Sequence, residues 1–218
     1  MIELLQSQLG LIQSINVGKQ RSIAWVEAGH IYADEIPSLS HEVGAIVGAK
    51  VSIALENMGI LVKKMLFIDD YNAQSNTLDL ENYQSLLSEH GFVADRLIME
   101  SSLVSDAEKV VAELEQGSLT EINKHGAVIL KKNHKKDKEV VLRKSPEMGT
   151  TPACVALDTA LYIKKQEEEA GICVTVLHSE WKSQQNAVKK VLKALGKDLP
   201  ILEVYYTDEG DIEIDFEY

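Results

Sequence analysis

The sequence predicts an α/β protein built around a mostly parallel β-sheet with helices on both faces. Short apolar runs such as Met65–Ile68 and Ile172–Leu177 do not alternate strictly with polar residues, which is typical of strands buried on both faces. Segments with helical spacing of apolar residues separate these runs, and glycines end several of them. Strands that alternate with helices in this order form parallel sheets through right-handed crossovers.

The first part of the chain, residues 1–61, is predicted to be an N-terminal elaboration of this sheet. Residues 22–33 are rich in β-branched and aromatic side chains, which favours a strand or a hairpin. A helix is expected over residues of about 41–58, because five apolar residues share one face: Val43, Val47, Val51, Ala54 and Met58. Gly44, Gly48 and Ser52 repeat on a neighbouring face, which indicates close approach of another backbone, within the chain or across a dimer.

Residues 62–200 are predicted to hold the βα repeats. The expected strands are residues 62–68, 94–99, 127–130 and 172–177, and the intervening helices are residues 78–89, 105–117, 151–167 and a last helix that ends at Gly196. Residues 139–143 are expected to return as a hairpin partner of residues 127–130. Residues 201–218 read as a C-terminal β-hairpin, because Ile212, Ile214 and Phe216 alternate with acidic residues. We therefore expect a single domain over residues 1–218 with a three-layer, Rossmann-like architecture.

The composition is that of an acidic globular protein. The 218 residues carry a formal net charge of −12, which argues against duplex nucleic acid as the main partner because phosphate binding needs a basic surface. Cys154 and Cys173 lie in apolar stretches and are predicted to be reduced core residues. The sequence begins without a secretory signal and has no apolar run long enough for a membrane span. These features predict a cytoplasmic protein that does not bind membranes.

Polar side chains follow each of the four predicted strands. They are Asp69, Asp70 and Asn72 after the first strand, Glu100 and Ser101 after the second, Lys131 and Lys132 after the third, and His178 and Ser179 after the fourth. In a parallel sheet the ligand crevice lies beyond the carboxyl ends of the strands. We therefore predict that these groups converge on one edge of the sheet.

The chemistry of these residues indicates a site for a divalent cation. Carboxylate and amide oxygens from Asp69, Asp70, Asn72 and Glu100 suit Mg²⁺ or Mn²⁺. Such an ion orients a phosphate and activates water. His178 and Asp69 are the candidate catalytic groups, since a histidine near its ordinary pKa can transfer a proton at neutral pH. The residues predicted to contact substrate are Lys131, Lys132, Ser101 and Ser179.

Three families share short stretches with this sequence. Phe67-Ile68-Asp69-Asp70-Tyr71-Asn72 resembles the end of the first strand in NYN/PIN-type metal-dependent ribonucleases, with Asp70 in place of a glycine. The same stretch, with Gly91-Phe92 after the next helix, is similar to a response-regulator receiver domain, although Lys131 stands where the phosphoacceptor aspartate is expected. Asp70-x-Asn72 is similar to part of the haloacid-dehalogenase motif. These resemblances imply metal-dependent chemistry on a phosphoester or a phosphoryl group.

Two hypotheses about function follow from the sequence. The first is a metal-dependent hydrolase acting on a phosphoester, in a nucleotide or in single-stranded RNA. The alternative is a non-catalytic α/β interaction or regulatory module, in the form of a homodimer that associates through the helix at residues 43–58 or through the C-terminal hairpin. No dinucleotide cofactor is expected, because the chain lacks the Gly-x-Gly-x-x-Gly fingerprint.

Overall fold

The computed structural model describes residues 23–32, 39–70, 80–132, 138–168, 170–197, 200–209 and 211–217. The chain divides into two units, which we describe separately. The larger unit comprises residues 1–101, 165–182 and 199–218, and the smaller unit comprises residues 102–164 and 183–198. Both units combine segments that are distant in the sequence, so this division leaves the prediction of a single domain untested.

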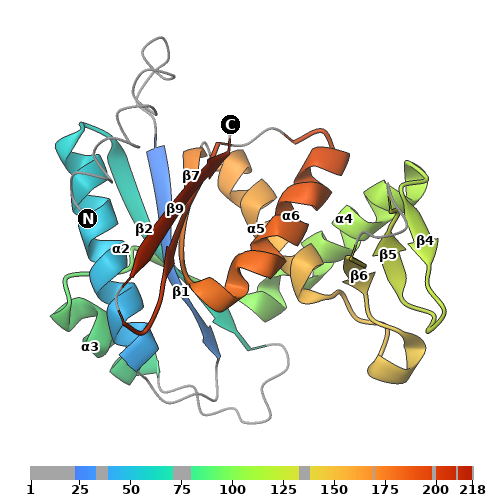
Figure 1. Cartoon of the computed structure of the whole chain (residues 1–218), viewed down its shortest axis with the longest axis horizontal. Coiled ribbons are helices and arrows are strands. Elements are labelled where there is room, and N and C mark those ends of the chain that lie inside the picture. The colour runs from blue at the N-terminus through green and yellow to red at the C-terminus, as the bar shows by residue number, and fades with distance from the viewer. Residues whose placement is uncertain are drawn as a thin grey trace. The chain divides into compact units, whose positions relative to one another are not determined.

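The larger unit contains a six-stranded sheet with the strand order β3-β2-β1-β7-β8-β9 (Figure 1). Its elements are β1 (Ile23–Tyr32), α2 (Leu39–Asn57), β2 (Leu61–Asp69), α3 (Leu80–Glu89), β3 (Arg96–Met99), β7 (Ala170–His178), β8 (Ile201–Tyr206) and β9 (Ile212–Glu217). All neighbouring strands are parallel except β8 and β9, which pair antiparallel. The prediction of an α/β fold with a mostly parallel sheet flanked by helices is therefore confirmed.

The strand β1 lies in the centre of this sheet, between β2 and β7. Residues 1–61 were predicted to be an elaboration of the sheet, but residues 23–32 of this segment supply a central strand. The register runs from Ile23 opposite Leu61 to Tyr32 opposite Asp69, with an irregularity between Glu27 and His30. Residues 1–22 lie outside the described part of the chain.

The helix α2 packs on one face of the sheet through its small residues. Alternate residues of β1, Ala24, Val26 and Ala28, join residues of α2 in one apolar core. A Cβ atom on Gly48 would lie 2.7 Å from the Cβ of Ala28, so only glycine allows this contact. Gly44, Gly48 and Ser52 therefore face the chain's own sheet, and this stripe is not available for a dimer.

The opposite face of β1 carries buried polar groups. Glu27 and Lys165 form an ion pair with 2.6 Å between Oε2 and Nζ, and their side chains are only 5% and 2% exposed. Thr175 and Glu203 on neighbouring strands are buried as well. A buried ion pair is retained at a desolvation cost, and losing one partner leaves an uncompensated charge.

The smaller unit contains a separate three-stranded antiparallel sheet with the order β4-β5-β6. Its elements are α4 (Val104–Gln116), β4 (Thr120–Ile122), β5 (Val128–Leu130), β6 (Val141–Arg143), α5 (Cys154–Glu167) and α6 (Lys182–Ala194); the last residues of α5 and the first of α6 belong to the larger unit. The predicted hairpin of residues 127–130 and 139–143 is confirmed by the pairing of β5 with β6. The prediction that residues 127–130 belong to the parallel sheet is wrong.

The strand β9 forms one edge of the six-stranded sheet and completes the predicted C-terminal hairpin. Ile212 and Ile214 pack against the apolar core, while Glu213 is exposed and forms an ion pair with Lys182. Within the described residues, we find no helix with the length and hydropathy required to cross a bilayer.

Candidate functional site

The carboxyl edge of the six-stranded sheet is the candidate site. The chain leaves β1 for β2 on one side, and later returns to place β7 on the other side of β1. Ligands of open α/β sheets bind outside the carboxyl ends of the strands at such a switch point. The helix α2 begins after β1, and His178 ends β7, so both elements lead into this edge.

Two buried carboxylates lie at the ends of β2 and β3. The parallel register pairs Ile68 with Met99. The next residues are Asp69, which ends β2, and Glu100, which comes directly after β3. Adjacent strands lie about 4.8 Å apart. The side chain of Asp69 is largely buried and that of Glu100 is completely buried. Two of the four predicted metal ligands thus come directly after a pair of hydrogen-bonded strand residues at this edge.

Asp70 has a structural role at this edge. Its Oδ1 accepts a hydrogen bond from the backbone N–H of Ser101 at 2.8 Å, and its Oδ2 accepts one from the Ser101 hydroxyl at 2.6 Å. Ser101 belongs to the short helix η1 (Glu100–Leu103) that follows β3. Asp70 therefore ties the end of β2 to the start of η1, which is the capping role common for an acid after a strand.

His178 lies between two carboxylates on the other side of the switch point. Its Nδ1 is 3.5 Å from Oε1 of Glu180, and its Nε2 is 3.7 Å from Oδ1 of Asp208. The His178 ring contacts the ring of Tyr206, its register partner on β8, edge to face. Both imidazole nitrogens are thus within ion-pair distance of an acid.

Tyr206 connects this histidine to the first turn of α2. Burial raises the pKa of the Tyr206 phenol above its ordinary value, the hydroxyl of Ser40 opposes this through a hydrogen bond, and the carboxylates of Asp208 and Glu180 raise it further. The phenol is therefore neutral at physiological pH. A Cβ atom on Gly44 would lie 2.6 Å from the Tyr206 hydroxyl oxygen, so this glycine allows the helix to approach.

The two groups of side chains, Asp69 and Glu100 on one side and His178 on the other, are separated by β1. Two strand spacings place β2 and β7 about 10 Å apart. Within the described residues, no cluster of three or more His, Cys, Asp or Glu side chains is arranged to hold a metal ion. Asn72, the fourth predicted ligand, lies outside the described residues. Ser179 follows His178 in the short helix η3 (Ser179–Trp181).

Lys131 and Lys132 do not follow a strand of the six-stranded sheet. They come after β5, which belongs to the antiparallel sheet of the smaller unit, so they do not follow a carboxyl strand end of the parallel sheet as predicted. Lys131 Nζ donates to the backbone oxygen of Ser118 at 2.6 Å, and Lys132 pairs with Glu139 at 3.1 Å. Both lysines are thus engaged within the smaller unit.

Sequence reasoning did not single out Ser40, Tyr206 and Asp208. Tyr206 was considered only as part of the C-terminal hairpin. The available signal was the parallel pairing of the last two long apolar runs, because it places Tyr206 opposite His178. The contact between Tyr206 and α2 depends on Gly44, and the spacing of residues in the sequence does not indicate it.

No family model matches the sequence, and no curated protein matches it. The fold is similar to that of three solved arginyl-tRNA synthetases, so the class of protein that the structure defines is an α/β fold of the kind found in these enzymes. The synthetase of Plasmodium falciparum aligns with a TM-score of 0.68 and 12% identity over 95% of this chain. The Campylobacter jejuni protein gives 0.63 and 14% over 92%, and the Thermus thermophilus enzyme gives 0.61 and 14% over 90%.

The chain spans only part of these synthetases, namely 59% of the Campylobacter chain, 49% of the Plasmodium chain and 50% of the Thermus chain. At 12–14% identity the likeness shows the fold alone. The activity that the names of these proteins give is therefore stated of them and not of this chain.

Proposed function

We propose that the carboxyl edge of the six-stranded sheet binds a phosphate-bearing ligand together with a divalent cation, and that the chain hydrolyses a phosphoester there. The observation that carries the proposal is the pair of buried carboxylates, Asp69 and Glu100, on adjacent strand ends. Mg²⁺ is commonly held by one or two carboxylates together with substrate phosphates. Asp69 and Glu100 are thus the residues that would hold Mg²⁺ or Mn²⁺.

A cation at this position would have an electrostatic basis. Two carboxylates close together in a poorly solvated site repel each other when both are ionised. A divalent ion offsets this repulsion and leaves positive charge for a phosphate oxygen. Both carboxylate oxygens of Asp70 accept hydrogen bonds from Ser101, so Asp70 would position the start of η1 beside the divalent cation.

His178 is the candidate group for proton transfer. Its two ring nitrogens lie 3.5 Å from Glu180 and 3.7 Å from Asp208, and these acids orient the ring. A protonated histidine close to the switch point is suited to protonating the leaving oxygen of a phosphoester. Ser179, the residue that follows, is the nearest predicted substrate contact in the sequence.

The substrate is proposed to be a nucleotide or single-stranded RNA. The names of the solved neighbours refer to enzymes that act on tRNA, which supports the inclusion of RNA among the probes. Because the chain spans about half of two of these proteins, no substrate of theirs is transferred to it.

The test is a calorimetric titration of the full chain with Mg²⁺ and with Mn²⁺. We expect saturable binding that is lost in Asp69→Asn and in Glu100→Gln, and retained in the matched control Glu209→Gln, an exposed acid elsewhere in the larger unit. Hydrolysis of ATP and of a single-stranded oligoribonucleotide should depend on the metal and fall in His178→Ala. Absence of metal binding by the unaltered chain would contradict the proposal.

The second candidate is a non-catalytic interaction or regulatory module. The observation behind it is that Ser101 engages both carboxylate oxygens of Asp70, which gives this acid a structural role. Sedimentation at micromolar concentration distinguishes its homodimeric form from a monomer. Since the Gly44 and Gly48 stripe faces the sheet, a dimer would have to use another surface.

A further inference from the structure

The smaller unit contains a lysine-lined groove that the proposed function does not use. Two adjoining hollows, of about 700 and 340 Å³, share Lys138, Val140 and Lys190 in their walls. One wall comes from the residues around β5 and β6, and the other comes from α6. Hollows of this size accommodate a small ligand.

The charge in this groove is strongly positive. Besides Lys138 and Lys190, it is lined by Lys131, Lys132, Lys144 and Lys193. Lys138, Lys190 and Lys193 are exposed and form no ion pair with any described residue. Among the described residues that line the groove, Glu139 is the one acid.

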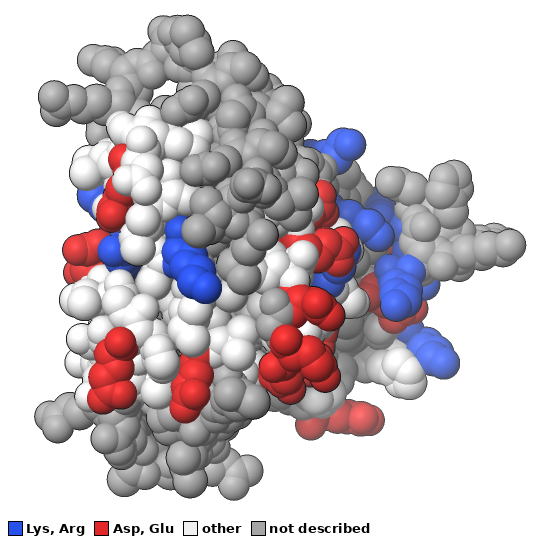
Figure 2. Space-filling model, turned by 60° about the vertical axis from the view of Figure 1, so that its left-hand side comes forward, with Lys and Arg blue, Asp and Glu red and all other residues white. Residues whose placement is uncertain are grey.

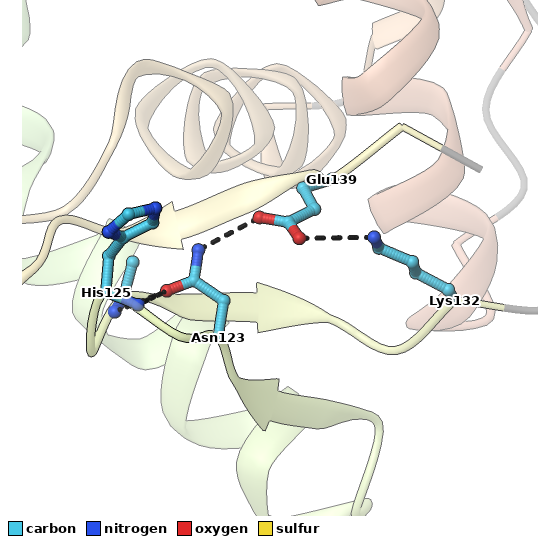
Figure 3. A network of polar contacts seen from close by, with 5 residues as sticks. Asn123, His125, Lys132 and Glu139 are labelled. Atoms are coloured by element: carbon cyan, nitrogen blue, oxygen red, sulfur yellow. Dashed lines mark hydrogen bonds and ion pairs between the residues drawn. The ribbon is translucent and has the colours of Figure 1, made fainter. Parts of the chain in front are cut away.

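A network of polar contacts holds Glu139 (Figure 3). Its Oε2 accepts a hydrogen bond from Asn123 Nδ2 at 2.9 Å, and its Oε1 accepts one from Lys132 Nζ at 3.1 Å. Asn123 also accepts from the backbone N–H groups of His125 and Ala127, which fixes the turn between β4 and β5. The single acid of the lining is thus neutralised locally by Lys132, which leaves Lys138, Lys190 and Lys193 to contact a ligand.

The sequence accounts for this concentration of positive charge. The smaller unit has 14 Lys and Arg against 10 Asp and Glu, a formal charge of +4, whereas the larger unit has 8 against 24, a formal charge of −16. On α6, Val188, Val191 and Leu192 are buried, so the face that carries Lys190 and Lys193 is left to solvent.

We propose that this groove binds a linear polyphosphate group, three or more phosphates in a row, as found in inorganic polyphosphate and in nucleoside triphosphates. Lysine ammonium groups are point charges that hydrogen-bond to phosphate oxygens without strict geometry. Gln184, Asn186 and Ser183 on α6 line the larger hollow and supply neutral polar contacts.

A nucleic acid fits this groove less well. Single-stranded binding sites use aromatic side chains as stacking platforms, and none is present among the described lining residues. A long strand would also continue beyond the groove along a chain whose net charge is −12. A short anion stays within about one Debye length of the lysines, roughly 8 Å at physiological ionic strength.

The test is calorimetric binding of sodium tripolyphosphate to the full chain without divalent metal. We expect saturable binding that weakens at least about tenfold, equivalent to about 1.4 kcal/mol, in the double variant Lys138→Gln/Lys190→Gln, because two ammonium groups that contact phosphate oxygens are lost. The matched control is Lys124→Gln, an exposed lysine of the same unit outside the groove, which should change affinity less than about twofold. Circular dichroism confirms that both variants fold.

Further probes separate the sources of the phosphate chain. ATP should bind about as tightly as tripolyphosphate if only the phosphates are contacted, and inorganic phosphate should bind far more weakly. Tighter binding of a single-stranded oligoribonucleotide that is lost in the same double variant would overturn the proposal in favour of RNA. Absence of saturable tripolyphosphate binding would also overturn it. Asp69→Asn should leave tripolyphosphate binding unchanged, so failure of the proposed polyphosphate site is distinguishable from failure of the proposed metal site.

Discussion

The two units of this chain handle electrical charge in opposite ways. The larger unit buries charged side chains within and beside its parallel sheet, among them Glu27, Lys165 and Glu203. In the smaller unit, every described lysine and arginine is at least partly exposed. The larger unit is also strongly acidic, and acidic side chains form separate patches on the face shown in Figure 2.

This difference follows from the strands that each unit uses. Long parallel strands such as β7 are covered on both faces, so a polar residue within them is buried and must find a partner. Three-residue antiparallel strands such as β5 leave most of their neighbours near solvent. We therefore expect a buried charge of the larger unit, such as Glu27, to affect stability more than an exposed lysine of the smaller unit does.

The largest effect should come from breaking the buried pair. Lys165→Met leaves Glu27 buried without its cation, and we expect a loss of about 3–5 kcal/mol in the free energy of unfolding. Urea unfolding followed by tryptophan fluorescence measures this loss, since Trp25 and Trp181 both belong to the larger unit.

Two further variants serve as controls for this experiment. The double variant Glu27→Gln/Lys165→Met should recover most of the loss, because no charge is left buried alone. Lys132→Met, which removes the partner of Glu139 in the smaller unit, should cost at most about 1 kcal/mol. Equal losses in Lys165→Met and Lys132→Met would contradict the contrast between the units.

A smaller effect is expected from filling the space at Gly44. Gly44→Ala brings a methyl group to 2.6 Å from the Tyr206 hydroxyl oxygen, which should cost about 1–3 kcal/mol of stability. Thermal unfolding of Gly44→Ala, Tyr206→Phe and the double variant forms a mutant cycle, in which removal of the hydroxyl should relieve part of the strain.

The matched glycine in the smaller unit is Gly117, at the end of α4. Its φ of −70° suits any residue, and an added Cβ would meet the flexible side chain of Leu119 at 3.3 Å and the backbone oxygen of Glu113 at 3.5 Å, the latter an ordinary contact distance. Gly117→Ala should therefore change stability by less than about 1 kcal/mol. A larger loss at Gly117 than at Gly44 would show that close packing is not special to the sheet of the larger unit.

The smallest effect concerns the pKa of Glu139 in the smaller unit. Hydrogen bonds from Asn123 and Lys132 lower this pKa below its ordinary value. Since the native pKa lies below the unfolded one, the stabilisation is complete at neutral pH and is lost as the pH falls through the native pKa. Carboxyl NMR titration should show this low value, and Asn123→Ala should raise it. An unchanged value in Asn123→Ala would remove the network from the explanation.

The sequence was a good guide to the strands that are continuously apolar. β2 and β7 were predicted because their buried residues form unbroken runs. β1 was ambiguous, because Glu27 and Gly29 interrupt its pattern, and the partner of the buried Glu27, Lys165, is 138 residues away in the sequence. The sheet to which β5 belongs could not be predicted, since periodicity does not report a strand's partners.

The site was predicted in part for the same reason. Parallel strands alone predict that Asp69 and Glu100 lie near one another, and the pairing of Ile68 with Met99, the residues just before them, agrees with this. The surroundings of His178 depend on where α2 lies, and this is set by contacts of Gly44 and Gly48 with distant residues. The predicted roles of Asp69, Glu100 and His178 in binding and catalysis stay predictions.

The edge strand β9 has a consequence for self-association. A second copy that paired edge to edge with it would bring two rows of acidic side chains, including Glu213 and Asp215, opposite one another. Like charges opposite one another across a strand pair are destabilising, and natural sheets use charged edges to prevent such pairing. At neutral pH the alternating acids of the last strand thus protect the protein against aggregation through its open sheet edge.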